Sequence, residues 1–242
     1  MSNNSKLIVA NWKMYKNLES SKDFFLKFPK ESYDNLIICP PFTLLDPLSR
    51  QGGFKLGAQD CSAFSSSEGS FTGDISAQML KNLTCEYVII GHSERRNYHN
   101  EKNEIIKQKV ANAHLQSLTC ILCIGESLEL RETGEYKDAL LEDLYEVISP
   151  SCIESNLIIA YEPIWAIGNG KTASIEQIEE MHEFLYKNLL SRFAISYKIL
   201  YGGSVNIENA KSILDISRVD GLLVGGASLD PENFYKIIKM TK

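Results

Sequence analysis

Short apolar runs recur through the whole chain, and this regularity limits its possible folds more than any other feature. Short continuous apolar stretches with polar flanks are typical of β-strands that are covered on both faces. Seven such runs occupy residues 7–10, 36–39, 87–90, 120–124, 157–161, 199–201 and 221–224. An eighth, residues 54–59, is weaker because it contains Lys55 and Gly57, but it fills the one wide gap in the series. The pattern therefore predicts eight strands.

Between these runs the apolar residues change to helical spacing, so strands and helices are expected to alternate. Helix-start signals agree, because Ser174 with Gln177 fits a capping box and Asp230 before Pro231 fits a first turn. Eight strand–helix units in 242 residues average about 30 residues each, which is a comfortable length for such a unit.

This arithmetic favours a closed (β/α)8 barrel over an open, doubly wound sheet. The open sheet usually has a glycine-rich turn directly after its first strand, and residues 10–13 contain no glycine. No composition shift or linker divides the chain. We expect residues 1–242 to form a single-domain α/β fold, a (β/α)8 TIM barrel with eight parallel strands surrounded by helices.

Charge and composition exclude several classes of partner. The formal net charge is −6, which opposes non-specific attraction to nucleic acid or to an anionic membrane surface. The sequence has no apolar stretch of about 18 residues and no signal-peptide core at its start, so we expect a cytoplasmic protein without a membrane span. Six cysteines are too few for a disulfide scaffold, and they are expected to be reduced core residues.

Polar residues follow the predicted strands, where the loops of such a barrel converge. They are Asn11, Lys13, Gln59, His92, Glu94, Glu126 and Glu162. A glutamate can accept a proton at neutral pH and a neutral histidine can donate to a carbonyl oxygen, so Glu162 and His92 together suggest enolisation. Taken singly, His92 could equally be a packed core histidine and Glu162 a rim ion pair. No His, Cys and Asp cluster has metal-ligand spacing.

Two glycine-rich turns, residues 202–204 and 225–226, follow the seventh and eighth predicted strands. Barrels often build a phosphate site there from main-chain N–H groups, although each turn alone could simply be tight. Residues 168–173 look like a phosphate-binding or dinucleotide-binding loop, but the first glycine of one motif and the strand adjacency of the other are missing. We therefore expect no cofactor.

With these motifs in place, the sequence closely resembles the triosephosphate isomerase family over essentially its full length. The matching blocks are residues 10–14, 57–60, 71–74, 90–96, 123–126, 160–168, 201–205 and 223–229. The resemblance implies an intramolecular aldose–ketose isomerase of glycolysis and gluconeogenesis. It would interconvert dihydroxyacetone phosphate and D-glyceraldehyde 3-phosphate through an enediol(ate), without a cofactor or metal.

The resemblance also implies a role for each site residue. Glu162 would be the base and His92 the electrophile, a pairing that this family exemplifies. Asn11 and Lys13 would stabilise negative charge and bind substrate, with Glu94 orienting Lys13. Residues 163–173 would form a lid that Tyr201 and Ser204 hold closed. The expected phosphate contacts are the main-chain N–H groups of Gly168, Ser204, Gly225 and Gly226.

A further implication is a homodimer formed through the loop at residues 61–72. In it, Thr72 would reach toward the partner's Asn11 and the partner's Lys13. The sequence departs from the common family pattern at Asn169, Asp60 and Asp74, where threonine, asparagine and glutamate are usual. Two alternatives stay open: a catalytically inactive barrel that serves as a binding or scaffold protein, and a Schiff-base aldolase that uses Lys198.

Overall fold

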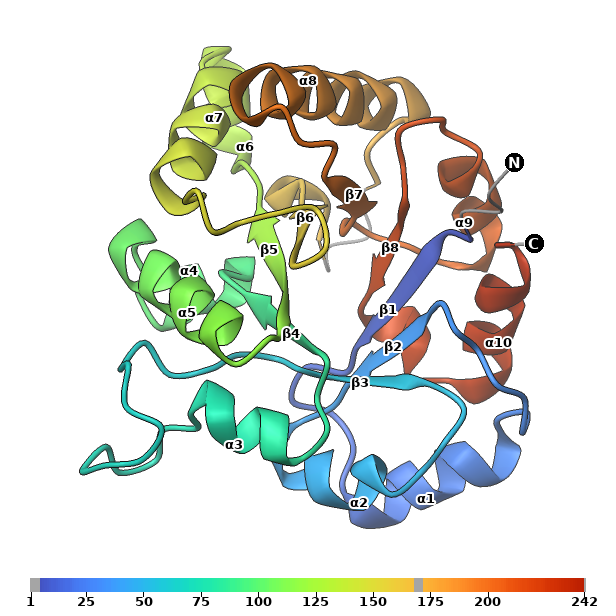
Figure 1. The fold of residues 1–242 in the computed structure, drawn as a ribbon. Helices are drawn as coiled ribbons and strands as arrows, with labels where there is room; N and C mark the ends of the chain where they lie inside the picture. The colour runs from blue at the N-terminus through green and yellow to red at the C-terminus, as the bar shows by residue number, and fades with distance from the viewer. Residues whose placement is uncertain (1–4, 168–171, 242) are drawn as a thin grey trace.

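The computed structural model describes residues 5–167 and 172–241. Within them, eight parallel strands close into a barrel in which each strand pairs with its neighbour in sequence and the last pairs with the first (Figure 1). The strands are β1 (Leu7–Asn11), β2 (Leu36–Cys39), β3 (Lys55–Ala58), β4 (Tyr87–Ile90), β5 (Thr119–Ile124), β6 (Leu157–Tyr161), β7 (Lys198–Tyr201) and β8 (Gly221–Val224). The predicted (β/α)8 fold is confirmed, and every predicted strand is present.

Helices surround this barrel (Figure 1). The α-helices in the described residues are α1 (Leu18–Lys27), α2 (Leu45–Ser49), α3 (Ala77–Asn82), α4 (Ser93–Tyr98), α5 (Asn103–Leu115), α6 (Leu128–Thr133), α7 (Tyr136–Val147), α8 (Ile175–Phe193), α9 (Ile207–Leu214) and α10 (Pro231–Lys239). Both predicted helix starts are confirmed: Ser174 forms a capping box with Gln177, and Asp230 caps α10 ahead of Pro231. Short 3-10 helices span Phe42–Leu44, Ile164–Ala166 and Gly226–Ser228.

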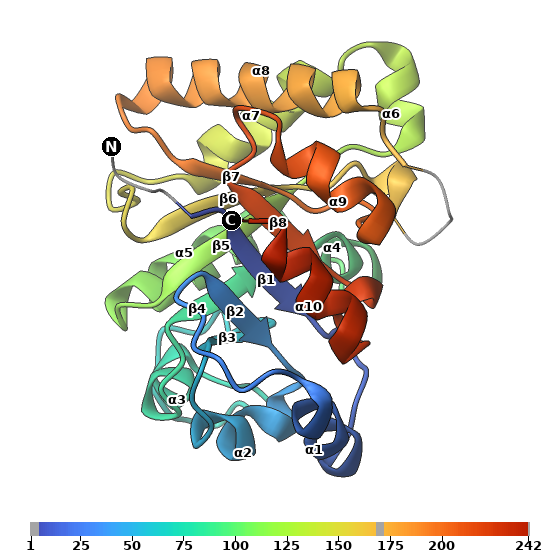
Figure 2. The same ribbon diagram turned by 90° about the vertical axis from the view of Figure 1, so that its right-hand side faces the viewer.

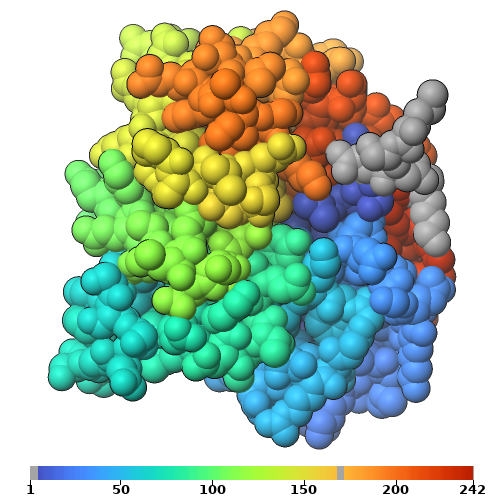
Figure 3. Space-filling model, viewed as in Figure 1, coloured from blue at the N-terminus to red at the C-terminus, as the bar shows by residue number. Residues whose placement is uncertain are grey.

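The core has two compartments because successive strand residues face opposite sides of the barrel wall. Side chains such as Val9 and Ile37 fill the interior of the barrel, whereas Ile8 and Ile38 pack outward against the helices. The space-filling view shows no open channel through the ring (Figure 3). Cys120 and Cys123 lie in different compartments, so the C-x-x-C motif is core, and all six cysteines are buried and free.

The carboxyl ends of the strands point toward one end of the barrel (Figure 2). This geometry brings the residues that follow different strands to a common rim. No helix in the described part of the chain is long and apolar enough to cross a membrane.

Candidate active site

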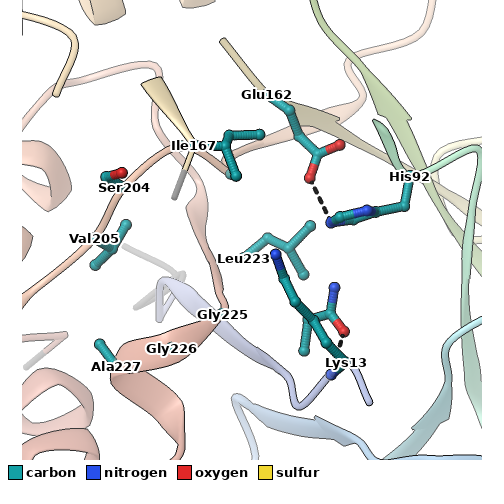
Figure 4. A pocket seen from close by; sticks show the side chains of 13 residues that line it. Lys13, His92, Glu162, Ile167, Ser204, Val205, Leu223, Gly225, Gly226 and Ala227 are labelled. Atoms are coloured by element: carbon teal, nitrogen blue, oxygen red, sulfur yellow. Dashed lines mark hydrogen bonds and ion pairs between the residues drawn. The ribbon is translucent and has the colours of Figure 1, made fainter. Parts of the chain in front are cut away.

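A cavity of about 240 Å³ opens at this rim, and residues at the carboxyl ends of β1, β4, β6, β7 and β8, or after these strands, line it. They are Asn11, Lys13, His92, Glu162, Ile167, Gly202, Gly203, Ser204, Val205, Leu223, Gly225, Gly226 and Ala227. In Figure 4, Glu162 and His92 lie on one side, Gly225 and Gly226 on another, and the Lys13 ammonium projects between them. The structure thus brings the polar strand-end residues and the glycine turns to one place.

Glu162 follows β6 and its side chain is only 2% exposed. Its Oε1 lies 3.0 Å from His92 Nε2, and its Oε2 accepts the main-chain N–H of Ser93 at 3.1 Å. Burial raises the pKa of Glu162, but His92 and the Ser93 N–H outweigh burial and hold the pKa below its ordinary value. Glu162 is therefore a carboxylate at neutral pH and can act as a base.

Glycine at two positions makes room for this glutamate. A Cβ on Gly125 would lie 1.6 Å from the carbonyl oxygen of Glu162, and one on Gly202 would lie 2.9 Å from its Cγ. Any larger residue at Gly125 would have to displace the main chain of Glu162. The glycines beside β5 and β7 thus set how closely the base can approach the barrel wall.

His92 sits at the N-cap of α4, where its Nδ1 accepts the main-chain N–H of Glu94 at 3.2 Å. Because that nitrogen accepts, the proton of the neutral ring lies on Nε2, which faces Glu162 and the cavity. Burial lowers the pKa of His92, whereas the Glu162 carboxylate raises it, and the net direction is upward. His92 and Glu162 thus form a buried pair. His92 is packed in the interior and Glu162 is paired, as the sequence allowed for each singly, but each is the partner of the other.

Lys13 has a left-handed main chain, with φ at +50°. A non-glycine residue in this region costs about 1–3 kcal/mol unless its surroundings hold it there. The Lys13 N–H donates to Asn11 Oδ1 at 3.0 Å, and its carbonyl accepts from Gln59 Nε2 at 2.9 Å. Its ammonium lies 2.7 Å from Glu94 Oε1. Sequence reasoning selected Gln59 as a strand-end residue but gave it no role.

Of the main-chain N–H groups that were predicted to bind phosphate at the cavity, that of Ser204 already has a hydrogen-bond partner. Gly225 and Gly226 line it, but the Ser204 N–H donates to the Ala166 carbonyl at 3.1 Å, and Ser204 Oγ donates to the same oxygen at 2.6 Å. Gly168 and Asn169 lie outside the described residues. In this conformation the Ser204 N–H is already bound to the carbonyl oxygen of Ala166.

Glu126 and Tyr201 lie behind the cavity. Glu126 is buried, and its Oε1 accepts hydrogen bonds from Arg131, the Tyr161 hydroxyl and Trp165 Nε1. Burial raises the pKa of Tyr201, and the nearby backbone of Ala173 opposes that effect. Both residues therefore contact the ends of the predicted lid segment, residues 163–173.

Other predicted residues lie elsewhere. Thr72 is exposed on the loop after β3 and does not line the cavity. Lys198 is the first residue of β7 and lines a different cavity at the amino ends of the strands, beside Lys55 and Thr119. This position gives the Schiff-base alternative no support. No group of three or more potential metal ligands occurs among the residues described.

Comparison with known proteins agrees with this geometry. The family model described as triosephosphate isomerase matches residues 6–241. The triosephosphate isomerase of Dictyoglomus thermophilum is 42% identical over 97% of this chain and 98% of that protein, and that of Thermus thermophilus is 41% identical over the same shares. The crystal structure of triosephosphate isomerase from Bartonella henselae is similar, with a TM-score of 0.86 and 35% identity over 98% of both chains. The chain belongs to the triosephosphate isomerase family.

Proposed function

We propose that four side chains around the cavity carry out the reaction of this family in the present chain. The chain is a triose-phosphate isomerase that interconverts dihydroxyacetone phosphate and D-glyceraldehyde 3-phosphate, and the catalytic residues are Asn11, Lys13, His92 and Glu162. The observation that carries this assignment is the 3.0 Å contact between Glu162 and His92 Nε2 in a cavity that also holds the Lys13 ammonium. This contact places a base beside a hydrogen-bond donor.

The reaction moves one proton between two adjacent carbons. Glu162 removes the proton from C1 of dihydroxyacetone phosphate, and the electrons of that C–H bond form the C1–C2 double bond of an enediolate. His92 Nε2–H donates to the oxygens on C1 and C2 as negative charge develops there. The hydroxyl proton on O1 then passes to the O2 oxyanion by way of His92. Glu162 returns the carbon proton to C2, the double-bond electrons form the new C2–H bond, and the electrons on O1 form the C1=O bond of the aldehyde, which restores the carboxylate.

The remaining groups hold the substrate and its charge. The Lys13 ammonium, oriented by Glu94, supports both the enediolate oxygen and the phosphate, and Asn11 fixes the main chain of Lys13. Gly225 and Gly226 line the cavity at the end of β8. Together with Ser204 and Gly168 they are the proposed phosphate ligands, since hydrogen bonds to an anion are worth about 1.5–3 kcal/mol each.

Shortening the base tests the assignment of Glu162. In Glu162→Asp the carboxylate is retracted by about one methylene, and such misplacement costs on the order of 10²-fold in kcat. A coupled assay with NADH and glycerol-phosphate dehydrogenase measures turnover, and sulfate inhibition checks that the phosphate site is intact. Glu176→Gln, an exposed change on α8, is the control. Full turnover in Glu162→Asp would remove Glu162 from the mechanism.

We further propose that residues 1–242 act as one domain in a cytoplasmic homodimer. The loop that contains residues 61–72 extends away from the barrel (Figure 1). On this loop the rings of Phe64 and Phe71 stack at 4.0 Å, and Phe64 is about half exposed. A cavity of about 640 Å³ beside the active site is lined by Lys13 and by the exposed Met14 and Tyr15. An exposed aromatic loop and an exposed apolar cavity fit each other across a dimer.

No contact among the described residues favours the alternative of a catalytically inactive barrel.

A further inference from the structure

A cluster of four charged side chains, three of them buried, lies beside the active-site residues of β3 and α4. Asp60 follows β3, Arg95 lies on α4, Glu101 precedes α5 and Lys109 lies within α5. The side chains of Asp60, Glu101 and Lys109 are 9%, 6% and 5% exposed. Two carboxylates and two cations are present, so the formal charges within the cluster cancel.

Each cation of this cluster contacts both carboxylates. Lys109 Nζ donates to Asp60 Oδ1 at 2.7 Å, to Asp60 Oδ2 at 2.8 Å and to Glu101 Oε1 at 2.6 Å. Arg95 Nε lies 2.8 Å from Asp60 Oδ2 and 2.7 Å from Glu101 Oε1. Because an unpaired buried charge is strongly unfavourable, the three buried side chains cannot turn away alone, and their two carboxylates hold the Arg95 guanidinium. The position of Arg95 is therefore fixed by groups outside its own helix.

Arg95 carries this constraint to the active site through its neighbour in sequence. The helix α4 has only six residues, and an isolated helix of that length is not stable by itself. Its orientation must come from contacts such as that between Arg95 and Asp60. Glu94 lies one residue earlier on the same turn, and its carboxylate binds the Lys13 ammonium at 2.7 Å.

The residue before Asp60 holds the same lysine by its main chain. Gln59 Nε2 donates to the carbonyl oxygens of Lys13 and Cys39, both at 2.9 Å. The dipeptide that follows β3 therefore contacts two parts of this site. Gln59 holds the main chain of Lys13 directly, and Asp60 contacts Arg95, the neighbour of Glu94.

We propose that Asp60 is a positioning residue for Lys13, acting through Arg95 and the Glu94 carboxylate. This inference rests on the proposed function, in which Lys13 supports the enediolate and the phosphate. Asp60 does not line the catalytic cavity, so it acts on the substrate only through this chain of contacts.

A double-mutant cycle between Asp60 and Glu94 tests the proposal. Asp60→Ala should lower kcat/KM about 10-fold, through both a higher KM and a lower kcat, because a displaced Lys13 weakens phosphate binding and charge stabilisation together. When Glu94 is already replaced in Glu94→Ala, the link to Lys13 is gone. Adding Asp60→Ala to that variant should then change kcat/KM less than about 2-fold.

Conservative and control variants separate positioning from general destabilisation. In Asp60→Asn, an amide oxygen at the place of Oδ2 can still accept from both Lys109 and Arg95, so this variant should recover kcat/KM to within about 3-fold of the parent. Glu183→Ala breaks the ion pair of Glu183 with Arg218 on the other side of the barrel. Its effects on kcat/KM and on the melting temperature should be independent of Glu94.

The outcomes distinguish this inference from the proposed function. If Glu94→Ala alone leaves KM and kcat unchanged, the proposed role of the Lys13–Glu94 pair is wrong. If Glu94→Ala is impaired and adding Asp60→Ala multiplies that defect in kcat/KM, only the positioning role is overturned. The same holds if a higher enzyme concentration fully restores kcat/KM of Asp60→Ala, because the defect then comes from subunit dissociation. Should Asp60→Ala not fold, Arg95→Gln breaks the same link from α4, and its cycle with Glu94→Ala decides in the same way.

Discussion

At the scale of single residues, the Glu162 carboxylate and the His92 imidazole are bound to each other in this conformation. In the proposed reaction, the Glu162 carboxylate must leave the imidazole before it can reach a substrate carbon. When it does so, the main influence that raises the pKa of His92 is withdrawn, while burial, which lowers that pKa, remains. The same movement that makes Glu162 available thus favours the neutral form of His92, which is the form that donates from Nε2.

The lowered pKa of Glu162 has a consequence for its titration. A carboxyl with a depressed pKa stays ionised as pH falls, so Glu162 should remain a carboxylate to below the ordinary glutamate pKa of about 4.3. In His92→Gln the imidazole partner is absent and burial dominates, so the pKa of Glu162 should rise. Carbon-13 NMR titration of the glutamate carboxyls in the parent, in His92→Gln and in the control His114→Gln measures this shift, and coincident titration of Glu162 in the parent and His92→Gln would contradict it.

Removing the cation at Lys13 should affect both binding and turnover. Lys13→Met keeps much of the side-chain volume but loses the charge that faces the cavity and Glu94. Losing one group that stabilises a developing oxyanion typically costs about 10²–10³-fold in kcat. We expect at least that loss together with a raised KM. Steady-state kinetics beside Lys187→Met, an exposed lysine of α8, provide the measurement; an unchanged KM would exclude a phosphate contact.

Local sequence patterns predicted the polar rim well, but they could not predict contacts that depend on distant partners. Asn11, Lys13, His92 and Glu162 were found because each follows an apolar run. The pairing of Asp60 with Lys109, 49 residues away, has no local signature. Nor does the hydrogen bond from the Ser204 N–H to Ala166, which lies 38 residues earlier in the chain.

At the scale of elements, continuous apolar runs predicted strands more reliably than helical spacing predicted helices. Strands β2, β4, β6 and β8 begin and end as expected, and β3 is shorter than its predicted run because only Lys55–Ala58 pairs with its neighbours. The short helices α2, α3, α4 and α6 have too few turns for an apolar period to be visible. Their positions are set by caps and by tertiary contacts.

One element carries a titrating group that should link stability to pH. His182 of α8 is fully buried, and burial lowers its pKa from 6.5 to about 4. The unfolded chain therefore binds a proton below about pH 6.5 that the folded chain does not bind until about pH 4. Stability should fall by up to about 3 kcal/mol across this window as pH decreases.

Denaturant unfolding at pH 7 and pH 4.5 checks this prediction. In His182→Phe the part of the pH dependence that comes from this group should disappear, whatever the effect of the substitution on stability at pH 7. His99→Gln, an exposed change, should keep the full dependence. Equal pH dependence in His182→Phe and the parent would show that His182 does not titrate as its burial implies.

At the scale of the whole molecule, the loop at residues 61–72 is the feature that the barrel itself does not need. Asn112 of α5 anchors its base by donating to the carbonyls of Ser62 and Phe64. Replacing residues 64–71 with a short glycine–serine linker should leave the barrel folded but abolish dimers. It should also lower activity about 10²-fold, because the loop of the proposed partner subunit no longer covers Lys13 and its neighbours.

Sedimentation velocity of this variant across a range of concentrations gives the assembly state, and circular dichroism gives the fold. The matched control is Ser66→Ala, which keeps the full length of the same loop. A dimer that persists without residues 64–71 would show that a different surface holds the subunits together.

The hydrogen bonds from Ser204 to Ala166 have a consequence for which molecules can enter the site. An anion that uses the Ser204 amide must compete with a carbonyl that already satisfies it. A bare ion such as inorganic phosphate gains little from this exchange, because it replaces one acceptor with another. A ligand that also reaches His92 recovers the lost free energy at its far end. We therefore expect the site to bind bare ions such as sulfate and inorganic phosphate more weakly than a phosphorylated ligand that also reaches His92.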